Sequence, residues 1–91
     1  MKNIKVKNMT SSRGNQIANQ FEITTSDGVY FQSYDSTIAF KSFKSDKIIL
    51  DNKTWDYSVT TGKYRNIFLN ENKKATEKKI KDGIYKLANL N

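Results

Sequence analysis

The sequence predicts an α+β domain, in which a small antiparallel sheet of about five strands carries one or two short helices near the C-terminus. In the N-terminal two thirds, apolar and polar residues alternate with a period of two in several short segments, which is typical of strands with one buried face. Between two of these segments stands Asp27–Gly28, a pair common in tight hairpin turns. From Tyr64 onward the apolar spacing changes to i, i+3 and i+4, with Ile67 and Phe68, which indicates a helix.

The first strand is expected around Ile4 and Val6, which alternate with lysines. A loop is expected at residues 10–15, which are rich in Ser, Gly and Asn. A second strand is expected at residues 21–25, followed by a two-residue type I′ turn at Asp27–Gly28. The pairing expected across this turn is Phe21 with Tyr34, Ile23 with Gln32 and Thr25 with Tyr30.

A second hairpin is expected from residues 38–43 and 47–50, with its turn near Ser45 and Asp46. Residues 84–87 also have strand spacing and are expected to add the last strand to the same sheet. All of these elements fit one domain spanning residues 1–91, because a chain of this length supports a single modest core.

The segment between the second hairpin and the first helix is expected to be extended. Trp55, Tyr57 and Val59 alternate with polar residues, which favours a strand or an extended stretch. Thr60 or Thr61 is expected to cap the following helix, because a threonine hydroxyl accepts hydrogen bonds from backbone N–H groups of the first turn.

A second, more polar helix is expected at residues 73–81, begun by Asn72 and ended by Asp82–Gly83. Three basic residues lie along one side of this helix. They are Lys74, Lys78 and Lys81, and we call them the lysine stripe. Such a stripe is either a contact surface for an anionic partner or a solvated helix face.

The charge of the chain favours an anionic partner. Sixteen Lys and Arg stand against nine Asp and Glu, which gives a formal net charge of +7. Residues 1–20 carry four bases and no acid, residues 21–62 carry four bases and six acids, and residues 63–91 carry eight bases and three acids. A fold that brings the two ends together would present a basic surface beside a less charged one. The same composition also suits a domain that uses charge only for solubility.

Two segments combine the residue types that bind phosphates and bases. Residues 54–66 interleave aromatic rings, hydroxyls and bases before a helix, and Lys63, Tyr64 and Arg65 are its candidate contact residues. The loop at residues 10–19 surrounds Arg13 with Ser, Asn and Gln. The rings are also explained as core residues, and the loop as a solvated connection.

The sequence predicts no enzyme, no metal site and no cofactor. It contains no His and no Cys, so the usual general base, the usual thiol nucleophile and the usual zinc ligands are missing. Asp51 and Asp56 are the nearest approach to a magnesium site, but turn and cap hydrogen bonds explain them better. No apolar run is long enough to span a membrane, and no leader is evident, so a cytoplasmic protein is expected. An exposed sheet edge would allow a homodimer as well as a monomer.

Several segments together resemble a group of small uncharacterised proteins of bacteriophages and related mobile elements. They are residues 30–39 (YFQSYDSTIA), residues 55–58 (WDYS), residues 60–64 (TTGKY) and residues 68–69 (FL). No activity comes with this resemblance. It implies a phage-type accessory protein in a bacterial host, and such proteins often bind nucleic acid or block a host defence system.

Three functions fit these observations. The leading hypothesis is a non-enzymatic binder whose basic surface engages nucleic acid or a host nucleoprotein. The second is an anti-CRISPR-like inhibitor that binds a host defence protein directly through an acidic patch on its target. The third is a sponge that closes aromatic and basic side chains around a nucleotide signal.

Overall fold

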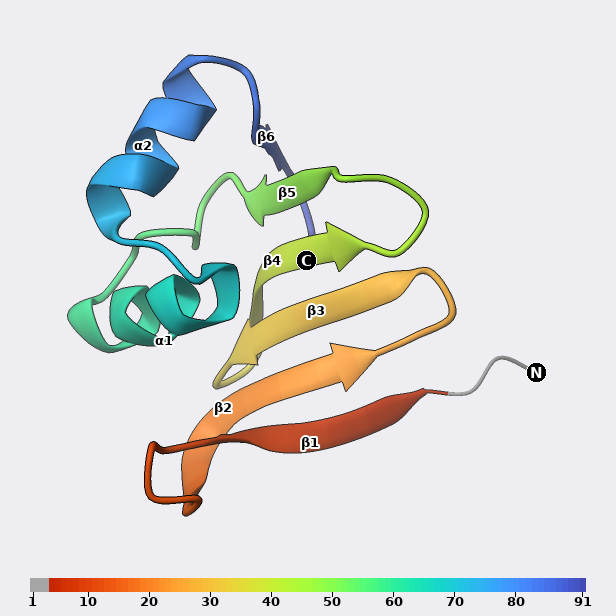
Figure 1. Cartoon of the computed structure of the whole chain (residues 1–91), viewed down its shortest axis with the longest axis vertical. Helices are drawn as coiled ribbons and strands as arrows, with labels where there is room; N and C mark the ends of the chain where they lie inside the picture. Colours follow the sequence, from red (N-terminus) through yellow and green to blue (C-terminus); the bar gives the residue numbers. More distant parts are fainter. Residues whose placement is uncertain (1–3) are drawn as a thin grey trace.

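The computed structural model describes residues 4–91, which form a six-stranded sheet and two helices (Figure 1). The elements in chain order are β1 (Lys5–Thr10), β2 (Gln16–Thr24), β3 (Gly28–Ser33), β4 (Ser36–Ser42), β5 (Ile48–Asp51), α1 (Val59–Leu69), α2 (Lys73–Lys81) and β6 (Lys86–Ala88). The strands lie in the order of the sequence. The predicted α+β class is confirmed, with one more strand than the sequence suggested.

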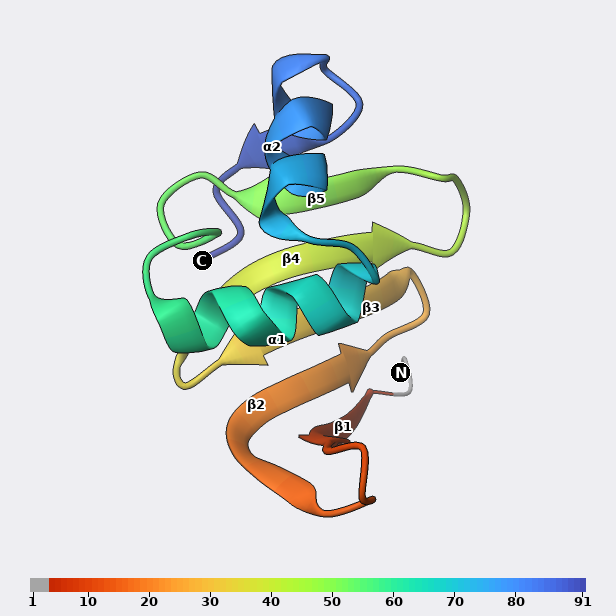
Figure 2. The same cartoon turned by 60° about the vertical axis from the view of Figure 1, so that its left-hand side comes forward.

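Both helices lie on the same face of the sheet, where α1 crosses in front of β3 and α2 lies beside β5 and β6 (Figure 2). Strands β1 to β5 are antiparallel to their neighbours, whereas β6 pairs with β5 in parallel. A parallel partner needs a crossover between the strands, and the two helices provide it. No helix within residues 4–91 is long and apolar enough to cross a membrane.

The register of the β2–β3 hairpin differs from the expected one by two residues. Phe21 pairs with Gln32, and Ile23 pairs with Tyr30. The turn therefore centres on Ser26 and Asp27, one position earlier than predicted, and the backbone N–H of Thr25 donates to the carbonyl oxygen of Gly28 at 2.8 Å. Because side chains alternate with a period of two, a shift of two residues leaves every side chain on its expected face.

Gly28 belongs to β3, where it allows β3 and β4 to approach closely, and it is not a turn residue. A Cβ atom at this position would lie 2.6 Å from Cε1 of Phe40 and would also collide with the backbone carbonyl oxygen of Lys41. Its φ angle is not among the positive ones of the chain. A glycine that makes room for a neighbouring strand looks the same in sequence as a turn glycine.

The prediction of an extended segment at Trp55 is wrong, because residues 52–56 form consecutive turns and Tyr57 is a bend. The buried carboxylate of Asp51 organises them by accepting hydrogen bonds from the backbone N–H groups of Lys53 at 3.0 Å and Thr54 at 2.9 Å. The helix cap is also two or three residues earlier than expected, since Ser58 is the N-cap of α1 and its Oγ accepts from the N–H of Thr61 at 3.0 Å.

The prediction for α2 is confirmed at both ends. The side chain of Asn72 caps its first turn by accepting from the N–H of Ala75 at 2.9 Å. Asp82 is the C-cap, and Gly83 follows with a φ of 77°. The last strand is displaced by two residues from its expected start, because the chain needs residues 82–85 to return from α2 to the sheet.

The core lies between the sheet and the two helices. Phe31 of β3 packs against Phe68 of α1, with ring centroids 5.6 Å apart. A buried hydrogen bond of 2.9 Å between the hydroxyls of Ser33 and Thr61 joins the same two elements. The Nζ of Lys41 donates to the carbonyl oxygen of Phe68 at 2.9 Å, near the C-terminal end of α1. Such contacts fix the orientation of α1 on the sheet.

A carboxylate holds α2 against the segment that leads into β6. Glu71 accepts hydrogen bonds from Lys79 at 2.6 Å, from the hydroxyl of Tyr85 at 2.9 Å and from the hydroxyl of Thr76 at 2.6 Å. Tyr85 and Thr76 are buried, so their hydroxyls bond to the carboxylate in place of water, whereas Lys79 is partly exposed.

Candidate anion-binding site

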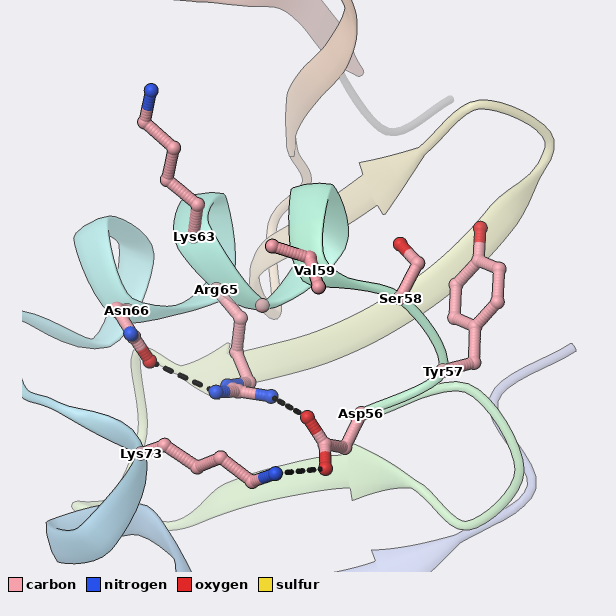
Figure 3. Close-up of a pocket in the computed structure, with 9 residues that line it drawn as sticks. Asp56, Tyr57, Ser58, Val59, Lys63, Arg65, Asn66 and Lys73 are labelled. Carbon is pink, nitrogen blue, oxygen red and sulfur yellow. Dashed lines mark hydrogen bonds and ion pairs between the residues drawn. The ribbon is translucent and has the colours of Figure 1, made fainter.

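Two neighbouring hollows lie on the helix side of the sheet, and Lys63 of α1 lines both. The first, of about 590 Å³, lies at the N-terminal end of α1 and reaches Lys73 at the start of α2 (Figure 3). We call it the Arg65 pocket. The second, of about 470 Å³, lies between α1 and the loop that joins β1 to β2. We call it the loop groove.

Arg65 is buried in the wall of its pocket, with only 1% of its surface exposed. Its guanidinium group donates to the carbonyl oxygen of Trp55 at 2.7 Å, to Oδ1 of Asp56 at 3.1 Å and to Oδ1 of Asn66 at 2.9 Å. Figure 3 shows the side chain of Arg65 extending from α1 between Asn66 and Asp56. Gly62 lies beside the guanidinium group, and a Cβ there would be 3.6 Å from Nη2, an ordinary contact distance. The geometry assigns this arginine to holding residues 55–56 against α1.

Asp56 links the two helices by pairing with two cations. Arg65 contacts one of its carboxylate oxygens, and Nζ of Lys73 lies 2.8 Å from the other. Partial burial acts to raise the pKa of Asp56, but the hydrogen bonds from Lys73 and Arg65 outweigh it, so the pKa lies below its ordinary value. One carboxylate between two cations leaves a net positive charge. Lys63 also lines this pocket, but its side chain points away from Asp56, Arg65 and Lys73 (Figure 3).

The loop groove brings together the two segments that the sequence singled out. Thr10, Ser11 and Ser12 of the β1–β2 loop form one wall, and Lys63, Tyr64 and Ile67 of α1 form the other. Nζ of Lys63 lies 5.4 Å from the centre of the Tyr64 ring. Lys63 is exposed, whereas Tyr64 is half-buried and packs partly against the core. The groove therefore combines a free cation, hydroxyl groups and the exposed part of an aromatic ring.

Arg13 lies in the same loop but lines neither hollow. It is exposed, and its backbone N–H donates to Oγ of Ser11 at 3.3 Å. The hydroxyl of Ser11 also accepts from the N–H of Asn15 at 3.2 Å, so it shapes the loop. Arg13 thus belongs to the loop that forms one wall of the groove, and within residues 4–91 its guanidinium group makes no hydrogen bond or ion pair.

The lysine stripe of α2 is separate from both hollows. Lys74, Lys78 and Lys81 are exposed, and Nζ of Lys78 lies 3.6 Å from a carboxylate oxygen of Asp82. The stripe is available to a partner that covers α2, but the fold does not bring it together with the loop groove.

Sequence reasoning missed Lys73 and misjudged Asp56. The sequence does not distinguish Lys73 from the other lysines of α2, and it predicts only turn or cap hydrogen bonds for Asp56. The contacts of Asp56 are nine and seventeen residues away in the sequence, at Arg65 and Lys73. No local pattern reports such a pair, although an arginine on the apolar side of a helix is a signal for a buried partner.

The polar lining of the two hollows is mainly basic and neutral. Their polar groups are ammonium and guanidinium cations, hydroxyls, amides and one paired carboxylate. Among residues 4–91, no three His, Cys, Asp or Glu side chains lie close enough to hold a metal ion.

Comparison with known proteins adds a family but no activity. Residues 4–83, which are most of the chain, match DUF8033, a family of unknown function. No curated protein and no solved structure matches the chain. The chain belongs to the DUF8033 family.

Proposed function

We propose that this protein is a non-enzymatic nucleic-acid binder that holds phosphate groups at the loop groove. The observation that carries the proposal is the meeting of Lys63 and Tyr64 with the hydroxyls of Thr10, Ser11 and Ser12. Ammonium groups and hydroxyls are the groups that proteins use most to contact phosphate oxygens. The net charge of +7 supports a polyanionic partner over an acidic or neutral one.

Basic side chains continue from the groove along the edge of the sheet. Lys5 pairs with Thr24, and Lys7 pairs with Glu22. Glu22 in turn pairs with Phe31, which faces α1, so these lysines lie on the helix side of β1. Both are exposed. A phosphate backbone lying in the groove would meet Lys7 and Lys5 when it continues along β1, with Glu22 opposite Lys7 as the one acid on this path within residues 4–91.

The proposal is tested by fluorescence anisotropy of nuclease-treated protein with labelled single-stranded DNA, duplex DNA and RNA over a salt series. We expect binding with a steep dependence of log affinity on log salt. Lys63→Gln should weaken binding and reduce the slope by about 0.7 to 1, which is the loss of one phosphate contact. Lys44→Gln, which removes the same charge in the exposed β4–β5 loop, is the control and should change the slope little.

The absence of binding to all three nucleic acids at low salt would overturn the proposal. A host defence or nucleoprotein target would then be the next candidate, and a complex that co-purifies after nuclease treatment would identify it. This outcome would agree with the phage-type accessory role that the sequence resemblance implies.

The Arg65 pocket favours a second candidate, the binding of a small nucleotide. Its volume of about 590 Å³ lies in the range of small-molecule sites. Lys73 would contact phosphates there, beside the exposed ring of Tyr57. Mass spectrometry of the small molecules released when the purified protein is denatured tests this candidate. Release of a nucleotide in a fixed ratio to protein would favour the sponge function over a nucleic-acid binder.

A further inference from the structure

We propose that the sheet face opposite the helices is a stacking surface for the bases of a single-stranded nucleic acid, with Tyr30 and Phe40 as its central rings. This inference rests on the nucleic-acid-binding function proposed above. It adds a second contact region and a preference for single strands.

The strand register defines this face. Phe31 packs against Phe68 of α1, so the neighbouring Tyr30 points to the other side of the sheet. Tyr30 pairs with Ile23 on β2 and with Phe40 on β4, and these partners share its side. Both helices lie on the opposite side (Figures 1 and 2). We call this surface the open face, and its apolar members are Val6, Phe21, Ile23, Tyr30, Phe40 and Ile49.

The two central rings are held in place before any partner arrives. The ring centroids of Tyr30 and Phe40 lie 4.5 Å apart, with an angle of 37° between the ring planes. The Phe40 ring also lies over Gly28, where a Cβ would be only 2.6 Å from its Cε1. Both rings are half-buried by their neighbours, so each offers an exposed part without free rotation. A ring that is already ordered loses little entropy when a base stacks on it.

The charge of the open face suits a polyanion. Lys86 of β6 pairs with Ile49 and is exposed on the same side. Asp51 lies two residues after Ile49 on β5 and so belongs to the same face. It is buried, however, and its carboxylate accepts from the backbone N–H groups of Leu90 and Thr54. The strand register thus gives the residues that β1 to β6 place on the open face. Among those that are exposed or half-buried, one is a lysine and none is an acid.

Hydrogen-bonding groups lie beside the rings. Gln32 and Thr37 pair with one another across β3 and β4 on the open face. The side-chain nitrogen of Gln32 donates to the carbonyl oxygen of Tyr34 at 2.7 Å. Its side-chain oxygen accepts no hydrogen bond within residues 4–91, so it can accept one from a partner. A base stacked on Phe40 or Tyr30 would meet such a group at its edge. A purely apolar partner would leave the Gln32 side-chain oxygen buried and without a hydrogen bond.

The edge strand β1 explains why a single strand fits better than a duplex. Lys5 and Lys7 lie on the helix side of β1, whereas Val6 between them lies on the open face. A flexible strand can pass over this edge and place its phosphates on the helix side and its bases against the rings. A duplex keeps its bases paired and is too stiff to follow so sharp a bend.

A second copy of the chain is the competing occupant of the open face, because apolar sheet faces also pair with one another. The charge of +7 on each copy opposes such a pairing and favours a polyanion. The oligomeric state of the free protein is therefore measured together with binding.

The experiment compares wild-type protein with the Tyr30→Leu/Phe40→Leu variant, using labelled oligothymidine, oligouridine and a duplex of equal length. Loss of base stacking on both rings should weaken binding to the single strands about thirtyfold or more. The salt slope should stay unchanged, since no charge is removed. Phe43→Leu is the matched control, because Phe43 is an exposed phenylalanine outside the paired strands and should leave affinity unchanged.

Crosslinking of the wild-type protein to bromouracil-substituted oligothymidine tests the same point if the double variant fails to fold. Trypsin cleaves after Arg13 and Lys41, and the fragment between them contains Phe21, Tyr30 and Phe40. Crosslinks should fall on these rings. Crosslinks confined to Tyr64 would overturn the stacking surface and leave the loop groove as the binding site.

The outcomes separate the two proposals. Binding that is equal for single strands and duplex, and unchanged in Tyr30→Leu/Phe40→Leu, refutes the stacking surface while nucleic-acid binding stands. No binding of any nucleic acid refutes both. A wild-type dimer in sedimentation that becomes a monomer in the double variant assigns the open face to a second copy and overturns the inference.

Discussion

Arg65 donates a hydrogen bond of 3.1 Å to Asp56, and this contact joins the first helix to the turns that precede it. The guanidinium group is buried, so the carboxylate is the anion that allows a positive charge inside the domain. Lys73 binds the second carboxylate oxygen and extends the link to the second helix. A residue that looks like a phosphate ligand in the sequence therefore has a structural partner.

Asp56→Ala should destabilise the protein by about 3 kcal/mol, because it leaves the buried guanidinium without its anion. Urea unfolding followed by Trp55 fluorescence measures the change. Asp46→Ala in the exposed β4–β5 loop is the control and should shift stability by less than about 0.5 kcal/mol. Equal stability of Asp56→Ala and wild-type protein would show that the hydrogen bonds to Trp55 and Asn66 are sufficient for Arg65.

Acid should destabilise the protein through Asp51, Asp56 and Glu71. Burial acts to raise the pKa of each, but hydrogen bonds outweigh it and lower all three below the ordinary values of 3.8 for Asp and 4.5 for Glu. A lowered folded-state pKa adds stability above the unfolded-state value, and this stability is lost as the pH falls toward the folded-state value. The free energy of unfolding should therefore be nearly constant above these ordinary values and decline below them.

Asp51→Asn should reduce the decline in the free energy of unfolding that acid causes. The carboxylate of Asp51 accepts from the N–H groups of Leu90, Lys53 and Thr54, and an amide cannot accept at both of its ends. We expect a loss of about 1 to 2 kcal/mol at neutral pH and a smaller loss at pH 3, measured by urea unfolding at both values. An equal loss at both pH values would mean that the charge of Asp51 has no part in the effect.

Local signals made some elements predictable. Asn72 caps α2 through a hydrogen bond within its own first turn, and Gly83 follows its C-cap with positive φ, so both boundaries depend on nearby residues only. Likewise, the alternation of apolar residues was enough to place the β2–β3 side chains on the correct faces even though the register was wrong.

The features that the sequence did not predict depend on contacts between residues far apart in the chain. Gly28 is required by Phe40 and Lys41 on the next strand, which the dipeptide with Asp27 does not reveal. Asp51 shapes the turns after β5 partly through Leu90, and this contact spans 39 residues. The loop groove is a similar case. Both of its walls were candidates in the sequence, but their meeting depends on how α1 crosses the sheet.

Gly28→Ala should destabilise the protein by about 1 to 3 kcal/mol, because its Cβ would collide with backbone of β4 as well as with Phe40. Gly62→Ala is the matched comparison. Its Cβ would meet the Arg65 guanidinium only at ordinary contact distances of 3.6 to 3.9 Å, inside a helix that alanine favours. We expect thermal unfolding to show a lower midpoint for Gly28→Ala and an unchanged or higher midpoint for Gly62→Ala. Similar losses in both would contradict the strand-approach explanation for Gly28.

The lysine stripe of α2 should contribute less to nucleic-acid binding than Lys63 alone. Lys74, Lys78 and Lys81 line neither hollow, and Lys78 is already near Asp82, so these cations act on a bound strand only through solvent. Replacing all three by Gln should lower affinity at low salt, where screening is weak, and leave affinity near physiological salt almost unchanged. The salt series used for Lys63→Gln measures both effects. A fall in the slope by about two or more would instead show that the stripe contacts phosphates directly, and would move the path of the strand across α2.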